Sequence, residues 1–236
     1  MSKTPIWKAI AEGLRGDIAR HHYKAGDKLP TEAELAARYG VNRHTVRRAL
    51  KDLAEAGMVH ARRGAGVFVA WAPTDYPIGR RVRFHQNLRN AGRAPAKDIL
   101  HLTTRLADAE EREALALPEG AMVHAYEGLS LADAHPIALF RSVFPAARLE
   151  GLCEVIRETR SVTAALETCG VRDYTRASTR LNAVSATAVQ ALHLRLREGA
   201  PLLRTQSINI DAEGAPVEYG HTWFCGDRVT LTVGDL

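Results

Sequence analysis

Apolar residues recur at intervals of three and four along the first third of the chain, and this spacing predicts helices. The first helix is expected over residues 6–20, with an apolar face formed by Trp7, Ile10, Leu14 and Ile18. A second helix opens at Thr31, which fits a capping box with Glu34 because each side chain can reach the other residue's backbone N–H. The residues of this helix that are predicted to face inward are Leu35, Ala36 and Tyr39.

A third helix follows and separates into an apolar and a basic face. Gly40 can adopt the positive φ of a turn, and Asn42 is a favourable N-cap. The predicted buried stripe consists of Val46, Ala49, Leu50 and Leu53, and Gly57 ends the helix. The side chains off this stripe are Arg43, His44, Arg47, Arg48 and Lys51. Such donors suit phosphates and the acceptor edges of bases, which indicates a recognition helix. The alternative is a solvated basic face.

A short hairpin is predicted directly after the third helix. Residues 58–62 and 67–70 are expected to be its strands, and Arg63, Gly64, Ala65 and Gly66 its turn. A hairpin in this position is a wing, and a basic wing tip can enter a minor groove. The alternative is an ordinary hairpin with solvated arginines.

The remainder of the chain alternates strands and helices. The expected strands cover residues 97–106, 122–131, 136–144, 172–184, 202–210 and 217–225, and the expected helices cover 108–115, 161–169 and 186–196. A mostly antiparallel sheet with helices packed on it accommodates this order most simply, so the predicted fold class is α+β.

The formal net charge of +5 is unevenly distributed over the 236 residues. Residues 1–70 contain 13 Lys and Arg against 7 Asp and Glu, whereas residues 71–236 contain 19 against 20. This asymmetry indicates a polyanionic partner for the first part only.

Composition limits the remaining classes. Hydrophobic residues make up 46% and charged residues 25%, as in ordinary globular proteins. The sequence contains no apolar run that could span a membrane and no signal peptide, so a cytoplasmic location is expected. Cys153, Cys169 and Cys225 fit reduced core thiols better than disulfides or a zinc site. Neither a metal nor a cofactor is expected.

The first third resembles the winged helix-turn-helix of the GntR family of bacterial transcriptional regulators. The matching residues are Gly26-Asp27-Lys28-Leu29-Pro30, Glu34-Leu35-Ala36, Gly40-Val41-Asn42-Arg43-His44-Thr45-Val46-Arg47 and Gly64-Ala65-Gly66-Val67-Phe68-Val69. The resemblance implies DNA contacts by Asn42, Arg43, His44 and Arg47, and by Arg63 and Gly64 in the wing. The expected DNA-binding set also includes Thr31, Thr45 and Arg62. Some members have a DNA-contacting Arg where this chain has Ala33, so that contact is absent here.

The later sequence resembles the HutC branch of the same family. Tyr76-Pro77-Ile78-Gly79-Arg80-Arg81, with Phe84 and Asn87-Leu88, is similar to regulators of phosphonate metabolism. Residues 76–236 resemble the HutC-type effector-binding (UTRA) domain, which shares its fold with chorismate lyase. The expected division is a DNA-binding domain over residues 1–70, a proline-containing linker over 71–77, and an effector-binding and dimerisation domain over 78–236. For Arg80, Arg81 and Arg83, sequence alone favours solvent exposure or interdomain pairing over contacts with DNA or an effector.

Ser161 and Thr163 begin a predicted helix whose free N–H groups could bind an anion. From sequence alone Ser161 fits a cap of its own helix better, whereas the resemblance implies a serine that holds a phosphate. Arg141 or Arg180 could complete an oxyanion clamp, because arginine binds phosphate-like groups with two hydrogen bonds. Each of these arginines alone fits an ordinary surface position better.

The resemblance also implies a ligand-binding role for Glu218, and Tyr219 is an adjacent candidate. Strand alternation places His221 on the face of Tyr219 and away from Glu218. Members that sense sugar phosphates often have Arg-x-Arg where this chain has Gly128-Leu129-Ser130. This departure favours a smaller anion, such as a phosphonate or phosphate, which Ser130 could contact.

These features predict a homodimeric transcriptional regulator, expected to be a repressor, that binds palindromic double-stranded operator DNA and is released by a small anionic effector. A sugar phosphate or an amino-acid derivative is the alternative effector. One rival hypothesis is a chorismate-lyase-like enzyme with a DNA-binding appendage, although no nucleophile–base spacing is evident. Another is a nucleoid protein that binds DNA without sequence preference.

Overall fold

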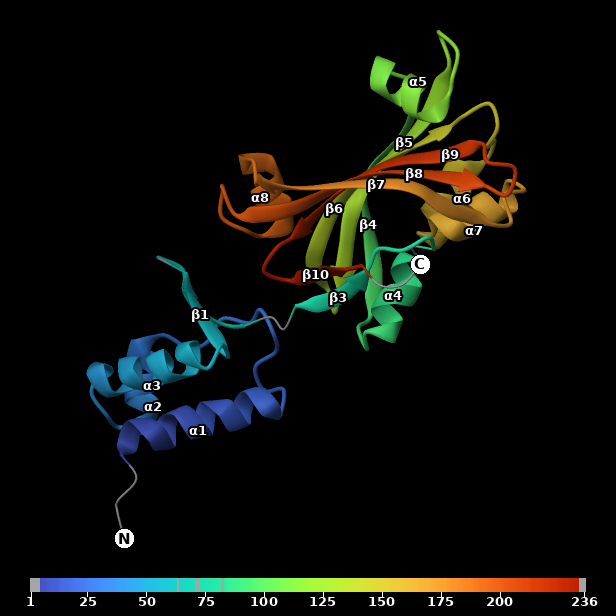
Figure 1. The fold of residues 1–236 in the computed structure, drawn as a ribbon. Helices are drawn as coiled ribbons and strands as arrows, with labels where there is room; N and C mark the ends of the chain where they lie inside the picture. Colours follow the sequence, from blue (N-terminus) through green and yellow to red (C-terminus); the bar gives the residue numbers. More distant parts are fainter. Residues whose placement is uncertain (1–4, 63, 71–72, 82, 234–236) are drawn as a thin grey trace. The chain divides into compact units, whose positions relative to one another are not determined.

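The chain divides into two compact units, Met1–Ala72 and Pro73–Leu236. A computed structural model describes residues 5–62, 64–70, 73–81 and 83–233 (Figure 1). Each unit has its own hydrophobic core, as expected of separate domains.

The first unit consists of three helices and a two-stranded hairpin. Its elements are α1 (Ile6–Ala19), α2 (Glu32–Tyr39), α3 (Arg43–Glu55), β1 (Val59–Arg62) and β2 (Gly66–Val69). The predicted apolar stripes of the helices meet in one core, in which Leu14, Leu35 and Val46 are fully buried. The strands pair antiparallel and add Val59 and Val69 to this core. The helix-turn-helix and the hairpin predicted from the sequence are both present.

The second unit is built on a six-stranded antiparallel sheet. Its strands lie in the order β4 (Pro95–Leu106), β5 (Met122–Ala132), β6 (His135–Pro145), β9 (Pro216–Cys225), β8 (Pro201–Asp211) and β7 (Tyr174–Ser185). Side chains along a strand alternate between the two faces of a sheet, so each strand contributes residues to both faces. The α+β prediction is confirmed.

Helices cover parts of both sheet faces. α6 (Leu152–Thr159) and α7 (Val162–Thr168) pack beside each other at one end, on the face that contains Tyr126 and Phe140 (Figure 1). We call this face the cavity face, and α4 (Phe84–Asn90) lies over it as well. α5 (Ala109–Leu115) and α8 (Ala188–Leu194) pack on the opposite face, which contains Tyr219 and Leu129 and is called the outer face.

Four elements of the second unit are not predicted by the sequence pattern: α4, α6, β3 (Thr74–Pro77) and β10 (Val229–Thr232). β3 pairs with β10 in parallel, and its Tyr76 packs on Phe224 with ring centroids 5.2 Å apart. The predicted linker over residues 71–77 is therefore too long, because residues 74–77 belong to the second unit. The local sequence does not predict β3, because this strand has only four residues and its partner comes from the far end of the chain. Residues 71 and 72 lie outside the described residues.

Candidate functional site

The start of α3 has the capping geometry that the sequence predicts. Asn42 Oδ1 accepts hydrogen bonds from the backbone N–H and the hydroxyl of Thr45, both at 2.9 Å. Gly40 ends α2 in the left-handed conformation, with φ of +63°. The Asn42 carboxamide oxygen is thus occupied by the cap, whereas its amide hydrogens have no partner among the described residues and can donate to DNA.

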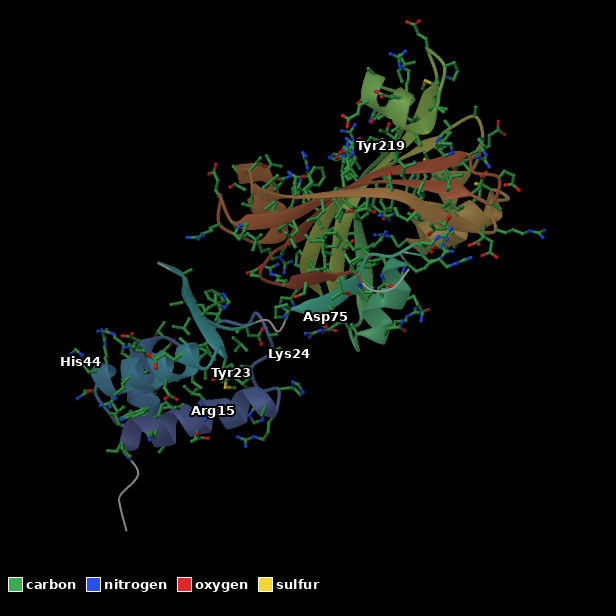
Figure 2. All side chains as sticks on the ribbon, in the orientation of Figure 1. Arg15, Tyr23, Lys24, His44, Asp75 and Tyr219 are labelled. Carbon is green, nitrogen blue, oxygen red and sulfur yellow. The ribbon has the colours of Figure 1, made fainter. Side chains whose placement is uncertain are left out.

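Basic side chains cover the face of α3 that is directed away from the core. Arg43, His44 and Arg47 are exposed, while the stripe that begins at Val46 is buried. Figure 2 shows His44 at the outer edge of this unit. Arg47 Nε and Nη2 donate to the two carboxylate oxygens of Glu32 in α2, at 2.9 and 2.6 Å. These hydrogen bonds from Arg47 hold the pKa of Glu32 below its usual value.

The remaining predicted DNA-binding residues lie at the start of α2 and in the hairpin. Thr31 forms the predicted capping box with Glu34. In the hairpin, Arg62 pairs with Gly66 in the strand register, and Gly64 has φ of +75°, a conformation that favours glycine. Arg63 and the side chain of Arg62 lie outside the described residues.

A cavity of about 370 Å³ opens on the cavity face of the second unit. Its volume falls within the range of small-molecule sites. Among the residues that line it, those with charged side chains are Arg83, Arg89, Lys97, Arg176 and Glu218. Hydroxyl groups and aromatic rings also line it, from Ser130, Ser142, Ser161, Thr163, Thr205, Thr222, Tyr76, Phe84, Phe140, Tyr174 and Phe224. The remaining lining residues are Ile78, His85, Gln86, Val162 and Asn209. The surplus of cationic side chains makes this cavity suitable for an anion.

Two arginines are fixed in the cavity wall by neighbouring side chains. The Arg83 guanidinium lies over the ring of Tyr174 at 4.0 Å, and its Nη2 donates to Asp173 at 3.2 Å. Its Nη1 is buried and has no hydrogen-bond partner among the described residues. Arg176 Nε donates to Asn209 at 2.7 Å. Both guanidiniums keep N–H groups that an anionic ligand can use.

Lys97 is surrounded by aromatic rings rather than by carboxylates. Its Nζ lies 4.4 Å from the ring centroid of Phe140, 5.3 Å from Phe84 and 5.7 Å from Tyr126. Burial by these rings lowers the pKa of Lys97 from 10.5 to about 8, although the negative charge of Glu218 opposes the shift. An anion that enters the cavity would stabilise the charged form of Lys97, because this lysine lacks a carboxylate partner.

Glu218 is the carboxylate of the described cavity wall, and its two oxygens are both oriented. One accepts from the Ser142 hydroxyl and the other from the Asn209 amide, each at 2.6 Å. Asn209 also accepts from Arg176, so these four side chains form one connected network on four adjacent strands, β6, β9, β8 and β7. The network holds Glu218 and Arg176 in a fixed relation to any bound ligand.

Ser161 and Thr163 lie at the cavity, and both hydroxyls already have partners. Ser161 Oγ accepts from the backbone N–H of Ala164 at 3.2 Å and caps α7, the interpretation that the sequence alone favours. Thr163 Oγ1 lies 2.9 Å from the hydroxyl of Tyr174. A hydroxyl group that already accepts a hydrogen bond can still donate one to a ligand.

The structure brings together four of the seven predicted effector-binding residues: Ser130, Ser161, Thr163 and Glu218. Arg141, Arg180 and Tyr219 lie elsewhere, and the prediction that either arginine completes the Ser161 site is wrong. Alternation explains the error, because Ser142 and Glu218 face the cavity and their neighbours Arg141 and Tyr219 therefore face the other way.

The three misplaced residues have other partners or solvent around them. Arg141 donates to the buried Glu111 at 2.9 Å, and Arg180 is exposed on β7. The Tyr219 hydroxyl donates to Glu110 at 2.5 Å and lies near the N-terminus of α5 (Figure 2). Its ring packs on His221 with centroids 5.0 Å apart, which confirms that these two residues share a face.

Sequence reasoning missed the cations that line the cavity. Arg83 belongs to the arginine cluster that the sequence assigns to solvent or to interdomain pairing, yet it faces the cavity. Arg81 pairs with Asp173 within the second unit, at 2.5 and 2.8 Å. A usable signal exists for Lys97, because it shares its strand phase with Ile99 and thus faces the same side of the sheet.

Within the described residues, no group of three or more His, Cys, Asp and Glu side chains could hold a metal ion. The three cysteines are free thiols, two of them buried. None of the described helices is long and apolar enough to cross a bilayer.

Comparison with known proteins extends over both units. The model of the bacterial regulatory proteins of the gntR family matches residues 7–69, and the UTRA domain model matches residues 90–230. An uncharacterized HTH-type transcriptional regulator of Rhizobium meliloti (strain 1021) is 39% identical over 229 residues, which cover 97% of this chain and 94% of that protein. The Probable transcriptional regulator PhnF of Escherichia coli (strain K12) is 33% identical over 228 residues, covering 96% and 94%.

A solved structure has the same two-part architecture. The crystal structure of PhnF from Mycobacterium smegmatis covers 98% of this chain and 99% of its own, with a TM-score of 0.65 and 24% identity, a likeness that concerns the fold. The helix-turn-helix, the antiparallel-sheet unit and the two family models agree with one another. The chain therefore belongs to the GntR family of bacterial regulatory proteins, and is a HutC-type transcriptional regulator with a UTRA domain.

Proposed function

We propose that this regulator is a homodimeric repressor of genes for phosphonate or phosphorus metabolism, released from its operator by a small phosphonate or phosphate ester that binds in the cavity. The observation that carries the proposal is the cluster of Arg83, Lys97 and Arg176 around a cavity of about 370 Å³. The resemblance of residues 76–88 to regulators of phosphonate metabolism makes phosphonates the first compounds to test, and a relative at 33% identity is named PhnF.

The cation cluster suits a tetrahedral anion better than a neutral ligand. Arg83 retains an unpartnered Nη1, and Arg176 retains N–H groups beyond its bonds to Asn209 and Thr179. Lys97 adds a positive charge that lacks a carboxylate within ion-pair distance among the described residues. A group with three anionic oxygens can accept from all three side chains at once, which a neutral sugar cannot do.

The cavity also touches the segment that leads to the DNA-binding unit. Tyr76 and Ile78 line the cavity, and Tyr76 belongs to β3, the first strand of the second unit. A ligand that packs against Tyr76 acts on the strand directly attached to the linker. Release of the operator requires that the ligand bind one arrangement of the dimer more tightly than the other.

Dimerisation and operator binding follow from the same scheme. Two recognition helices in a symmetric dimer would contact two half-sites about one helical turn (roughly 34–36 Å) apart, so the operator is expected to be palindromic. Because a bacterial operator lies on DNA in the cytoplasm, the proposed regulator would act there. Light scattering coupled to size exclusion tests the dimer, and selection of bound sequences from random DNA yields the operator.

The test of the effector combines calorimetry with operator binding. Methylphosphonate, 2-aminoethylphosphonate and inorganic phosphate are titrated into the full-length protein, and operator affinity is measured at constant ionic strength with and without each compound. Saturable binding with a loss of operator affinity supports the proposal. Binding that leaves operator affinity unchanged contradicts the release mechanism, and absence of binding contradicts the ligand class.

A regulator of the same type that senses a sugar phosphate or an amino-acid derivative is the alternative. Glu218 favours a ligand with a hydroxyl or amino group beside its anion, and the same calorimetry with glucosamine 6-phosphate tests this. An enzymatic role is disfavoured, because no hydroxyl group of the described cavity wall is hydrogen-bonded to a histidine that could act as a base.

A further inference from the structure

The ion pair between Glu32 and Arg47 connects the two helices of the helix-turn-helix. Glu32 lies in the first turn of α2, and Arg47 lies one turn into α3. The pair is bidentate, with Nε and Nη2 of Arg47 each bonded to one oxygen of Glu32. Arg47 has no other hydrogen bond among the described residues, so Glu32 alone sets the direction of its guanidinium.

This ion pair contributes little to the stability of the fold. The Arg47 side chain is 61% exposed and that of Glu32 is 31% exposed. Ion pairs at such positions change stability only slightly, because water screens the charges and fixing a long side chain costs entropy. What the pair does determine is the orientation of the arginine, since two parallel hydrogen bonds restrict a planar guanidinium to one plane.

The orientation leaves the outer edge of Arg47 free. A guanidinium has five N–H groups, and Glu32 occupies the one on Nε and one of the two on Nη2. The two on Nη1 and the second on Nη2 remain, and one N–H of Nη1 together with that of Nη2 forms a two-donor edge at the end of the side chain. This edge matches the O6 and N7 acceptors of guanine in the major groove.

The carboxylate also acts on its surroundings through its charge. Arg43 and His44 lie close enough to Glu32 for their charges to lower its pKa further, after the larger effect of Arg47. Glu32 is therefore an anion on α2, beside the basic side chains of α3. A fixed negative charge there repels DNA phosphates in every sequence, and this repulsion weakens non-specific binding.

We propose that Glu32 is a positioning and specificity-determining residue, which holds Arg47 with its two-donor edge toward one guanine in each operator half-site. Arg47 makes the contact with the base, and Glu32 acts through Arg47. The inference rests on the operator binding proposed above. Removal of the Glu32 charge should therefore reduce the selectivity of the protein for its operator and raise its affinity for DNA of any sequence.

The experiment uses the full-length protein and an operator selected by the wild-type protein from random DNA. Affinities for this operator, for operators with each half-site G·C pair changed to A·T, and for random DNA are measured for the wild type, Glu32→Gln and Glu55→Gln. Glu55 is a matched control, because it is an exposed ion-paired glutamate at the far end of α3. Glu55→Gln removes the same charge as Glu32→Gln but leaves the ion pair between Glu32 and Arg47 intact.

Glu32→Gln is expected to lower discrimination at one G·C pair per half-site by about 5- to 10-fold, part of the value of a bidentate contact, while its affinity for random DNA stays equal or rises. Glu55→Gln is expected to keep the wild-type discrimination. In an Arg47→Ala background, Glu32→Gln is expected to cause no further loss at that base pair, which shows that the two residues act together.

Three outcomes overturn the inference: wild-type discrimination in Glu32→Gln, an equal loss at all positions, or additive losses in the double variant. Retained affinity for random DNA confirms that the variant is folded, and Glu32→Asp provides a second variant if Glu32→Gln does not fold. A wild-type protein that selects no DNA sequence contradicts the proposed function itself, an outcome distinct from the three above.

Discussion

Replacement of Lys97 by methionine is expected to stabilise the protein and to weaken its binding of anions. Met has a similar length and no charge, and the rings of Phe84, Phe140 and Tyr126 around Nζ provide an apolar environment for it. The two effects have opposite signs because a group placed to bind a ligand is not placed to stabilise the empty protein.

The size of the stability gain in Lys97→Met follows from the pKa of Lys97. Burial lowers this pKa from 10.5 to about 8, which corresponds to a penalty on the order of 3 kcal/mol for the charged form in the folded protein. The attraction between the ammonium group and the rings offsets about 1 kcal/mol of this penalty. Lys97→Met should therefore raise the free energy of unfolding at pH 7 by about 2 kcal/mol.

The pH dependence has a defined sign. Between pH 8 and 10.5 the unfolded chain holds a proton on Lys97 that the folded protein has released, so the wild type gains stability as the pH rises through this window. The stability advantage of Lys97→Met is complete below pH 8 and disappears by pH 10.5. The affinity of the wild type for an anion falls as the pH rises above 8, because deprotonation of Lys97 removes the positive charge that attracts the anion.

Two assays measure these effects. Urea denaturation from pH 7 to 10.5 gives the stabilities, and calorimetry with methylphosphonate gives the affinities. Loss of a charged hydrogen bond should weaken binding by at least about 10-fold. Lys51→Met is the matched control, because Lys51 is 75% exposed on α3 and is not among the residues that line the cavity. A Lys97→Met protein that is less stable than the wild type and binds methylphosphonate equally well would refute the reasoning.

Five further variants test other parts of the structure. Asn42→Ala should cost about 1 kcal/mol of stability by urea denaturation, through loss of the α3 cap. Arg83→Ala should abolish most methylphosphonate binding in calorimetry, whereas Arg141→Ala should keep it and lose about 1–3 kcal/mol, because Glu111 is buried and loses a partner. Burial raises the pKa of Glu111, yet hydrogen bonds, above all from Arg105, hold it below its usual value overall. The wild type therefore loses stability as the pH falls below about 4.5, and Glu111→Gln should remove part of this loss. Gly128→Ala should cost roughly 1–3 kcal/mol, since a Cβ there overlaps the neighbouring strand's backbone.

The DNA-binding unit could be predicted closely from the sequence because its signals are local. The Asn42 cap, the Gly40 turn and the apolar stripe that starts at Val46 each involve residues within one or two helical turns. The orientation of Arg47 could not be predicted, because its partner Glu32 is on another helix and the distance between them depends on how the helices pack.

The cavity could be predicted only in part, and the reason lies in the sheet. Ser161 and Glu218 were identified through a family resemblance, whereas Lys97 and Arg176 face the cavity because of strand phase and register. A bulge between Arg176 and Ser178 shifts that register, which no local pattern of the sequence reveals. The same alternation placed Arg141 and Tyr219, each adjacent in sequence to a residue of the cavity wall, on the outer face.

The central claim is that an anion in the cavity and DNA on the recognition helix oppose each other. The most direct test measures methylphosphonate affinity by calorimetry for the free regulator and for its operator complex, and operator affinity with and without saturating methylphosphonate. By linkage, both affinities must fall by the same factor, which we expect to lie between about 5- and 150-fold. Equal methylphosphonate affinity for the free and the operator-bound protein would contradict the account.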